Sequence, residues 1–329
     1  MSTLETPPAA TVPPFSPEDT DVLVVGGGAA GLSAATVLAR SRRRVVVVDA
    51  GEPRNAAAEG VHAFLGHDGI PPSELLRRGR AEVARYGGHL VDGTAVSAKP
   101  VGDRLEVTLA DGATWSARHL VVTTGAVDEL PDVPGLREQW GHGVIHCPYC
   151  HGWEVRDRRI VVLATGPAAV HQAQLFRQLT DDLTVVLHDP SALDEEQVAR
   201  LRALGMPVVA GPAHRLVAEG ARVVGVAVAD AVVPADAVVV ASVVHARSAL
   251  LTGLDLGVTD IEMMGTVVAR AVPADPMGRT TVPRVWVAGN VTDPMAQVVM
   301  AAAAGTRVGA VVNAEMVSED VERQLTAVG

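Results

Sequence analysis

This sequence has very little cysteine, and what it has lies in one place. Only 2 of its 329 residues are cysteine, Cys147 and Cys150, so no disulfide framework of the kind that holds small secreted proteins together can form. A reducing compartment, the cytoplasm, is therefore expected. Aromatic residues are also scarce, at 3%. No uninterrupted apolar run reaches membrane-spanning length, because Pro234 and Asp236 break the best candidate, residues 231–244.

Positive charge is in the minority as well. The chain carries 27 Lys and Arg against 38 Asp and Glu, and it has no basic stripe, which argues against nucleic acid as a partner. Residues 1–20 lack the basic and apolar regions of a signal peptide and are expected to be a disordered tail. The length suggests two domains, and 48% apolar residues are ample for their cores.

The two cysteines form a Cys-x-x-Cys motif, which indicates redox chemistry. The spacing lets two thiols close and reopen a small disulfide ring, and such motifs can lower the pKa of one thiol. Zinc is the alternative, because His142, His146 and His151 lie close to the motif. Structural zinc usually takes a second ligand pair from a distant segment, and this sequence offers none. The pattern thus favours redox chemistry, and no metal is expected.

A dinucleotide-binding pattern opens the chain. A strand over residues 21–25, a helix over 32–41 and a strand over 45–48 are predicted, in βαβ order. Asp49 ends the second strand, at the distance where an acid takes ribose hydroxyls. The first turn carries G-x-G-x-x-G, formed by Gly26, Gly28 and Gly31. In this motif the glycines permit a tight turn, close approach to a pyrophosphate and close helix packing.

A weaker copy of this unit stands in the middle of the chain. A strand over residues 160–163, a helix over 171–179 and a strand over 183–188 repeat the order, but the turn reads Ala-Thr-Gly-Pro-Ala-Ala. Further strands are predicted at 120–126, 208–210, 223–228, 238–240 and 285–290, and a helix of small residues at 301–312.

Together these motifs resemble the low-molecular-weight thioredoxin reductase family. The resemblance rests on the Gly-Gly-Gly-x-x-Gly turn, a mid-chain Thr-Thr-Gly, the Cys-x-x-Cys before the second βαβ unit and a late Val-Ala-Gly-Asn. It implies an α/β fold with two Rossmann-like, three-layer ββα dinucleotide-binding domains, the second inserted in the first. The FAD domain would comprise residues 21–126 and 250–329, and the insert 127–249 would carry the cysteines. A homodimer is also implied.

The resemblance further implies which residues hold FAD. Loops 51–55 and 64–69 would lie near it. Asn290 replaces an aspartate that contacts the flavin ribityl chain in most relatives, while Gln297 either lies near the flavin ring or is a polar residue at a helix start. In full, the expected cofactor-binding residues are Gly26, Gly28, Ala29, Ala30, Gly31, Asp49, Ala50, Asn55, His62, Asp68, Thr124, Gly125, Gly289, Asn290, Gln297 and Val298.

The second turn departs from the family pattern. Ala164 replaces the first glycine, and Pro167 has no backbone N–H with which to hold a phosphate. Where relatives have basic residues for the 2′-phosphate of NADP, this chain has Asp189, whose charge repels a phosphate. NADPH is therefore expected to bind weakly or not at all.

The residue after the second cysteine departs as well. Thioredoxin reductases have an aspartate that moves protons there, whereas this chain has His151, a residue type with a pKa of about 6.5. Residues 147–154 resemble the dithiol oxidase branch of the family, and loops 51–55 and 64–69 fit that branch too. Its members form disulfides in small sulfur-containing natural products, such as gliotoxin, dithiolopyrrolones like holomycin, and romidepsin.

The resemblance to that branch implies an FAD-dependent oxidase of a small dithiol, with dioxygen as acceptor and hydrogen peroxide as product. Substrate would attack Cys147, Cys150 would face the flavin, and His151 would take protons, unless His142 or His146 does. Tyr149 and Trp153 either line a small-molecule pocket or pack the local turn. The alternatives are an NAD(P)H-dependent thioredoxin reductase and a non-catalytic FAD-binding protein.

Overall fold

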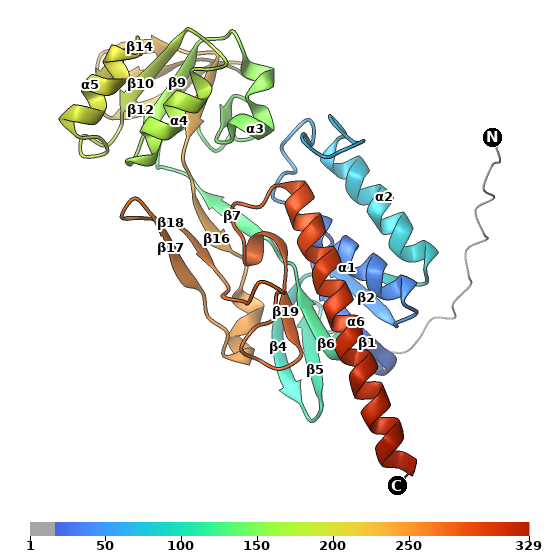
Figure 1. The fold of residues 1–329 in the computed structure, drawn as a ribbon. Helices are drawn as coiled ribbons and strands as arrows, with labels where there is room; N and C mark the ends of the chain where they lie inside the picture. The colour runs from blue at the N-terminus through green and yellow to red at the C-terminus, as the bar shows by residue number, and fades with distance from the viewer. Residues whose placement is uncertain (1–16, 329) are drawn as a thin grey trace, which may run out of the picture.

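Two parallel β-sheets organise residues 17–328, the part of the chain that the computed structural model describes (Figure 1). A 3-10 turn, Pro17–Asp19, precedes the first strand, β1 (Thr20–Val25), in which Thr20 is fully buried. The predicted tail at 1–20 is therefore too long: its last four residues belong to ordered elements. Residues 1–16 lie outside the described residues.

The first sheet holds a parallel core in the order β3-β2-β1-β6, with β19 paired to β6. The bounds of the strands that join β1 are Val45–Asp49 for β2, His89–Asp92 for β3, Thr114–Val122 for β6 and Val285–Val287 for β19. Residues 22–25 and 45–48 are β-branched or leucine and buried on both faces, as a parallel sheet covered on both sides requires. The first predicted βαβ unit is thus present.

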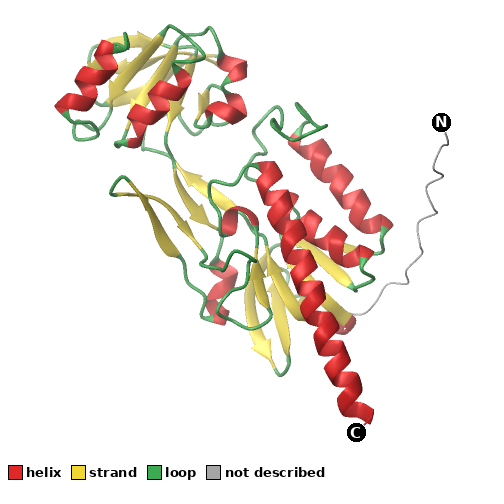
Figure 2. Cartoon of the chain, viewed as in Figure 1, coloured by secondary structure: helices red, strands yellow, loops and turns green. Residues whose placement is uncertain are grey.

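Three helices cover one face of this sheet, α1 (Ala29–Arg40), α2 (Pro72–Arg85) and α6 (Val298–Val328) (Figures 1 and 2). Helix α1 begins inside the glycine motif, three residues before the predicted start, because Gly28 is its N-cap. Helix α6 runs along α1 and is much longer than predicted. A Cβ at Gly305 would lie 1.9 Å from the Ala30 carbonyl oxygen, so the small residues allow the two helices to touch.

The opposite face of the first sheet carries an antiparallel hairpin and a short turn of helix. The hairpin, β4 (Ala95–Val101) and β5 (Arg104–Leu109), extends β6, and a 3-10 segment, η3 (Ala249–Leu254), packs against β4. Leu251 and Leu254 of η3 join the buried cluster under the sheet. Helices on one face, sheet in the middle and hairpin on the other make three layers.

Two connecting strands leave and re-enter this region (Figure 1). β7 (Ala126–Glu129) and β16 (Val243–Ala246) pair antiparallel with each other. A second hairpin, β17 (Thr259–Met263) and β18 (Thr266–Ala271), continues the same small sheet. Everything between β7 and β16 belongs to the second parallel sheet and its coverings. The domain limits 127–249 remain a prediction.

The second parallel sheet has the order β11-β10-β9-β15-β8. Its strands are β8 (Val144–Ile145), β9 (Ile160–Ala164), β10 (Leu183–Leu187), β11 (Val208–Ala210) and β15 (Ala237–Val240). Its helices are α4 (Ala168–Phe176) and α5 (Glu195–Ala203), and an antiparallel sheet is formed by β12 (Ala213–Glu219), β13 (Arg222–Val228) and β14 (Ala231–Pro234). Helix α4 begins three residues earlier than predicted and ends three residues sooner. No helix within residues 17–328 is long and apolar enough to cross a membrane.

Candidate functional site

A cavity of about 970 Å³ lies where the first sheet meets the segment that carries the cysteines. One part of its wall comes from turns at the carboxyl ends of β1, β6 and β19, including Gly28 and Gly125. Another part comes from Cys150 and His151. Ligands of open α/β sheets bind at the carboxyl ends of the strands, and this volume suits a large cofactor.

The glycines of the first turn differ in what surrounds them. Gly26 has φ +108°, and a Cβ there would lie 2.3 Å from the Thr123 carbonyl oxygen. A Cβ at Gly31 would lie 1.8 Å from the Gly26 carbonyl oxygen, so this glycine serves packing. Gly28, at the N-cap of α1, faces open space. The turn therefore leaves room at a helix N-terminus for an anionic group, which fits a dinucleotide pyrophosphate.

Asp49 is held at the cavity wall by two donors. Its Oδ1 accepts a hydrogen bond from the Gly27 backbone N–H at 2.9 Å, and its Oδ2 pairs with Arg80 at 3.2 Å. These contacts fix the carboxylate beside the glycine turn while leaving further lone pairs for hydroxyl donors. Its predicted contact with a ribose remains a prediction.

All but two of the predicted cofactor-binding residues line this cavity. They are Gly26, Gly28, Ala29, Ala30, Asp49, Ala50, Asn55, His62, Thr124, Gly125, Gly289, Asn290, Gln297 and Val298. The exceptions are Gly31, which lies beneath the turn, and Asp68, which instead contacts His62. The Asn290 side-chain N–H groups donate to three backbone carbonyls of residues 293–296, so only its oxygen is free to accept. Arg54 of the expected loop 51–55 also lies in this wall, whereas the sequence did not predict Arg80, Trp140 or Arg247 there.

The two cysteines are joined in a disulfide, with their Cα atoms 5.3 Å apart. Cys147 is the N-cap of a short helix, α3 (Pro148–His151), which Pro148 starts because its missing N–H needs no partner there. Cys150 lines the cavity, whereas Cys147 does not, although both are partly exposed. Sulfurs bonded to each other are not thiolate ligands, so this geometry favours redox chemistry over zinc.

The two ring nitrogens of His151 have no hydrogen-bond partner among residues 17–328, and both are buried. Burial lowers the pKa of His151 below 6.5, although Glu154 and Glu59 act to raise that pKa; His62 and His142 lower it further. A neutral imidazole beside Cys150 can accept a proton from an incoming thiol or donate to a bound group.

The other two candidate histidines are placed differently. His146 lines the cavity, stacks on Trp140 at 5.4 Å between ring centroids, and has its pKa lowered by burial to about 4. His142 is exposed, with Nδ1 3.4 Å from the Trp140 carbonyl oxygen. Neither follows a cysteine directly, so His151 is the best placed of the three.

The two aromatic residues near the disulfide are both largely exposed. Tyr149 is 67% exposed and Trp153 is 66% exposed. The Arg156 guanidinium lies 4.1 Å from the centre of the Trp153 ring, and it also donates a hydrogen bond to the Trp153 carbonyl oxygen. Trp153 thus has a contact within the local turn, and a role of either aromatic residue in a small-molecule pocket stays a prediction.

An ion pair ties the loop before α2 to the two connecting strands. Arg54 makes two hydrogen bonds to Asp128 of β7, at 2.7 and 2.6 Å, and Ser242 donates to the same carboxylate at 2.7 Å. Burial acts to raise the pKa of Asp128, but the hydrogen bonds from Arg54 and Ser242 outweigh it and lower that pKa. Arg54 and Asp128 both line the cavity, so the network holds one part of its wall in place.

The second βα turn lacks the features of the first. Pro167 is the N-cap of α4 and has no N–H to offer an anion. The Asp189 carboxylate accepts hydrogen bonds from the backbone N–H and the hydroxyl of Ser191, and these bonds lower its pKa. It is therefore a fixed negative charge. No residue of 164–169 lines the cavity.

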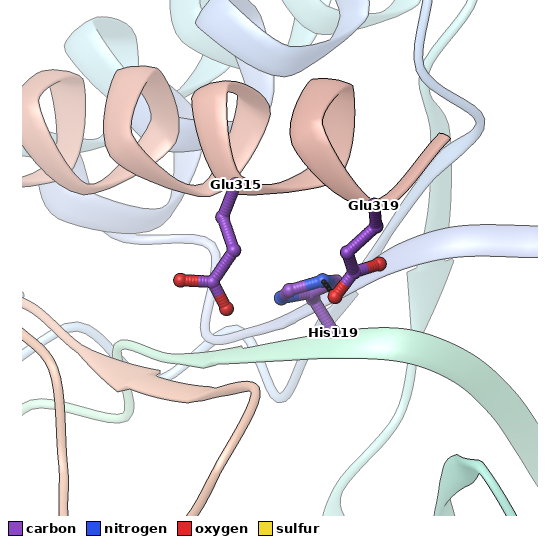
Figure 3. Close-up of side chains that lie close together, drawn as sticks. All are labelled: His119, Glu315 and Glu319. Atoms are coloured by element: carbon purple, nitrogen blue, oxygen red, sulfur yellow. Dashed lines mark hydrogen bonds and ion pairs between the residues drawn. The ribbon is translucent and has the colours of Figure 1, made fainter. Parts of the chain in front are cut away.

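A separate group of possible metal ligands lies where α6 crosses β6 (Figure 3). Its members are His119, Glu315 and Glu319, and each already has a partner. The Trp286 indole N–H donates to Nδ1 of His119, and Nε2 of His119 contacts Glu319 at 3.1 Å. Glu319 also pairs with Arg118 and Arg284, and Glu315 pairs with Arg279. We interpret the group as an ion-pair network that holds α6 to the sheet.

Comparison with known proteins places the chain among disulfide oxidoreductases. A family profile described as pyridine nucleotide-disulphide oxidoreductase matches residues 20–305. The solved structure of a protein named HlmI is 43% identical, with a TM-score of 0.86, over 94% of this chain and 96% of that one. Thioredoxin reductase sirT of Leptosphaeria maculans is 29% identical over 93% of this chain and 97% of its own length.

A third relative is matched only in part. A probable thioredoxin reductase of Arthroderma benhamiae is 38% identical over 170 residues, 49% of this chain, and the chain spans 42% of that protein's length. The three matches together confirm the thioredoxin reductase-like resemblance that the motifs predicted, and they confirm the α/β fold with Rossmann-like sheets.

Proposed function

We propose that this chain, which belongs to the pyridine nucleotide-disulphide oxidoreductase family, oxidises a small dithiol to a disulfide. Its thioredoxin reductase-like family members are enzymes that bind FAD. The observation that carries the proposal is the pairing of a redox disulfide with His151 at the cavity wall. A neutral, unpartnered imidazole beside Cys150 is suited to take the proton of a thiol.

The position of each cysteine suggests its role in the reaction. Cys150 lines the cavity in which FAD would bind, which leaves Cys147 for the substrate. A substrate thiol gives its proton to His151, and its sulfur forms a bond with Cys147, which does not face the cavity. The bond between Cys147 and Cys150 breaks, and Cys150 leaves as a thiolate. The second substrate thiol then displaces Cys147, so the substrate loses two electrons and the enzyme disulfide gains them. FAD, when bound, supplies the two-electron chemistry that couples this dithiol to dioxygen.

The second turn supports dioxygen as the acceptor, with NADPH playing little part. Pro167 offers no N–H to a phosphate, and Asp189 presents a negative charge where a 2′-phosphate would lie. We further propose a small sulfur-containing natural product as substrate, since residues 147–154 resemble the dithiol oxidase branch. A cytoplasmic homodimer completes the proposal.

A second candidate function is an NAD(P)H-dependent thioredoxin reductase, because curated relatives carry that name.

To distinguish the two functions, purified enzyme should be mixed with dithiothreitol in air, and oxygen uptake and hydrogen peroxide should be measured. We expect one peroxide per dithiol oxidised. Turnover only when both NADPH and a protein disulfide are supplied would overturn the oxidase in favour of the reductase.

The roles of the cysteines need a separate test. Cys150→Ser should trap a mixed disulfide between Cys147 and a thiol probe, because no neighbouring thiol remains to displace it. Cys147→Ser should react with the same probe far more slowly, because Cys150 faces the cavity. Intact-mass spectrometry measures both adducts. Faster trapping in Cys147→Ser would exchange the two roles.

A further inference from the structure

Two carboxylates stand opposite each other where β2 and β3 end. Asp49 and Asp92 are the last residues of these two strands, and the parallel register pairs one with the other. The Asp49 side chain is only 17% exposed, whereas that of Asp92 is 84% exposed, and both residues line the cavity. Like charges at opposed positions of neighbouring strands repel each other, so a cation between them stabilises the pair.

Arg80 of α2 supplies that cation. Its guanidinium donates to both acids, with one terminal nitrogen 3.2 Å from Oδ2 of Asp49 and the other 2.6 Å from Oδ1 of Asp92. Arg80 also lines the cavity, as do Pro72 and Leu76, and the intervals of four residues place all three on one face of the helix. The side chain thus joins the helix wall of the cavity to the ends of two strands.

Both oxygens of Asp49 are consequently held. The Gly27 backbone N–H donates to Oδ1 at 2.9 Å, and Arg80 donates to Oδ2. Each oxygen can accept a further hydrogen bond, so the carboxylate still has lone pairs for a ribose. In a dinucleotide-binding βαβ unit, the acid at this position accepts from the ribose 2′-hydroxyl. Without Arg80, Oδ2 would lose its donor, and the charge of Asp92 would no longer be offset.

We infer that Arg80 is a positioning residue, which holds Asp49 in the orientation that accepts from the adenosine 2′-hydroxyl of FAD. The inference rests on FAD binding in this cavity and on no feature of the dithiol reaction proposed above. Arg80 acts through Asp49, and its second bond keeps the charge of Asp92 from displacing that carboxylate. The same cation offsets the negative charge that the two acids present to the diphosphate of FAD.

The test measures how well the protein distinguishes FAD from its analogue that lacks the adenosine 2′-hydroxyl. Holoenzyme is equilibrated with an equimolar excess of both flavins, unbound flavin is removed, and mass spectrometry quantifies the two flavins that remain bound. Wild type should prefer FAD on the order of tenfold or more, as one hydrogen bond to a charged group provides. Arg80→Met should bring the ratio close to one. A general loss of stability would weaken both flavins alike and leave the ratio unchanged.

Arg78→Met is the matched control and should keep the wild-type ratio, because Arg78 lies on the same helix and pairs with Glu74 but does not line the cavity. Arg80→Lys keeps the charge but lacks the guanidinium fork that reaches two acids, so its ratio should lie between those of wild type and Arg80→Met. Arg80→Gln replaces Arg80→Met if that variant does not fold.

Two results would overturn the inference. One is equal binding of both flavins by wild type, and the other is a wild-type ratio in the variant that lacks the guanidinium. Neither result bears on dithiol oxidation, which fails separately if dithiothreitol does not reduce the flavin of the wild type.

Discussion

The two βα turns of this chain share one plan and differ in what the helix N-terminus offers. In the first, Gly28 faces open space, and Asp49 is oriented beside it by the Gly27 N–H. In the second, Gly166 also faces open space, but Pro167 removes a donor and Asp189 adds a negative charge. Equally open space therefore comes with different donors and charge in the two turns, and we expect this difference to decide which of them binds a nucleotide.

The largest expected effect comes from filling the first turn. Gly28→Val places a branched side chain where a pyrophosphate would approach the N-terminus of α1, so the purified protein should lose its FAD and with it turnover. The flavin absorbance per protein measures this directly.

Gly166→Val is the matched control for that variant. It fills equally open space in the second turn, and FAD content and dithiol oxidation should remain as in wild type. Full flavin occupancy in Gly28→Val would mean that the first turn does not hold the cofactor. Loss of flavin in both variants would erase the contrast between the turns.

The second largest effect is expected at His151, which lines the cavity beside Cys150. His151→Gln should lower the rate of disulfide exchange by ~10²–10⁴-fold, because a positioned general base is lost. Since burial lowers the pKa of His151, wild-type activity should fall with decreasing pH only below 6.5, and the variant should lack that limb. Stopped-flow reduction between pH 5 and 8 tests this. A wild-type limb centred above pH 7 would contradict the placement.

A smaller effect is expected when NADPH is tested as the reductant, because its binding depends on the second turn. Pro167 removes a phosphate donor and Asp189 adds a like charge, and both changes weaken the binding of NADPH. Anaerobic mixing with NADPH should therefore bleach the flavin far more slowly than dithiothreitol does. Asp189→Arg should speed the reaction with NADPH if charge is part of the cause. Rapid bleaching of wild type by NADPH would remove the difference between the turns.

The smallest effect concerns stability where the regions meet. The pKa of His146 falls to about 4 in the folded protein, so the unfolded chain binds more protons below pH 6.5, and stability decreases as pH falls through that range. By pH 5 the loss is roughly 2 kcal/mol. Urea unfolding at pH 7.5 and pH 5 should show that His146→Gln loses less stability than wild type. An equal loss would show that His146 does not carry this dependence.

Local sequence patterns correctly predicted the elements whose structure depends on interactions between residues that are close in the sequence. The strand at residues 21–25 and the glycine turn were predictable because β-branched runs and fixed glycine spacings act over a few residues. The start of α1 was misplaced because an N-cap glycine looks like part of the turn. The length of α6 was underestimated because its second half is held by Glu319 and Asp320 pairing with distant arginines.

The site was predictable only in its parts that come from motifs. The first glycine turn and the Cys-x-x-Cys motif were expected from spacing, whereas the other cavity residues were expected from the family resemblance. The pairing of Arg54 with Asp128, and of His62 with Glu154, joins residues 74 and 92 positions apart, and no local pattern encodes such a contact. Folding brings them together, so neither contact could be derived before the structure.

The pairing of β19 with β6, and of α6 with α1, has a consequence for synthesis on the ribosome. Val122 of β6 emerges more than 160 residues before Val285 of β19, which at about 5–20 residues per second is a delay of roughly 8–30 s. During that time the edge of the first sheet is uncovered, whereas the second sheet, whose strands span residues 144–240, can already close. Nascent chains stalled before residue 285 should therefore carry no flavin, and stable flavin on such chains would show that the C-terminal elements are dispensable for binding. We therefore expect the emergence of β19 and α6 to set the moment at which the enzyme acquires its cofactor.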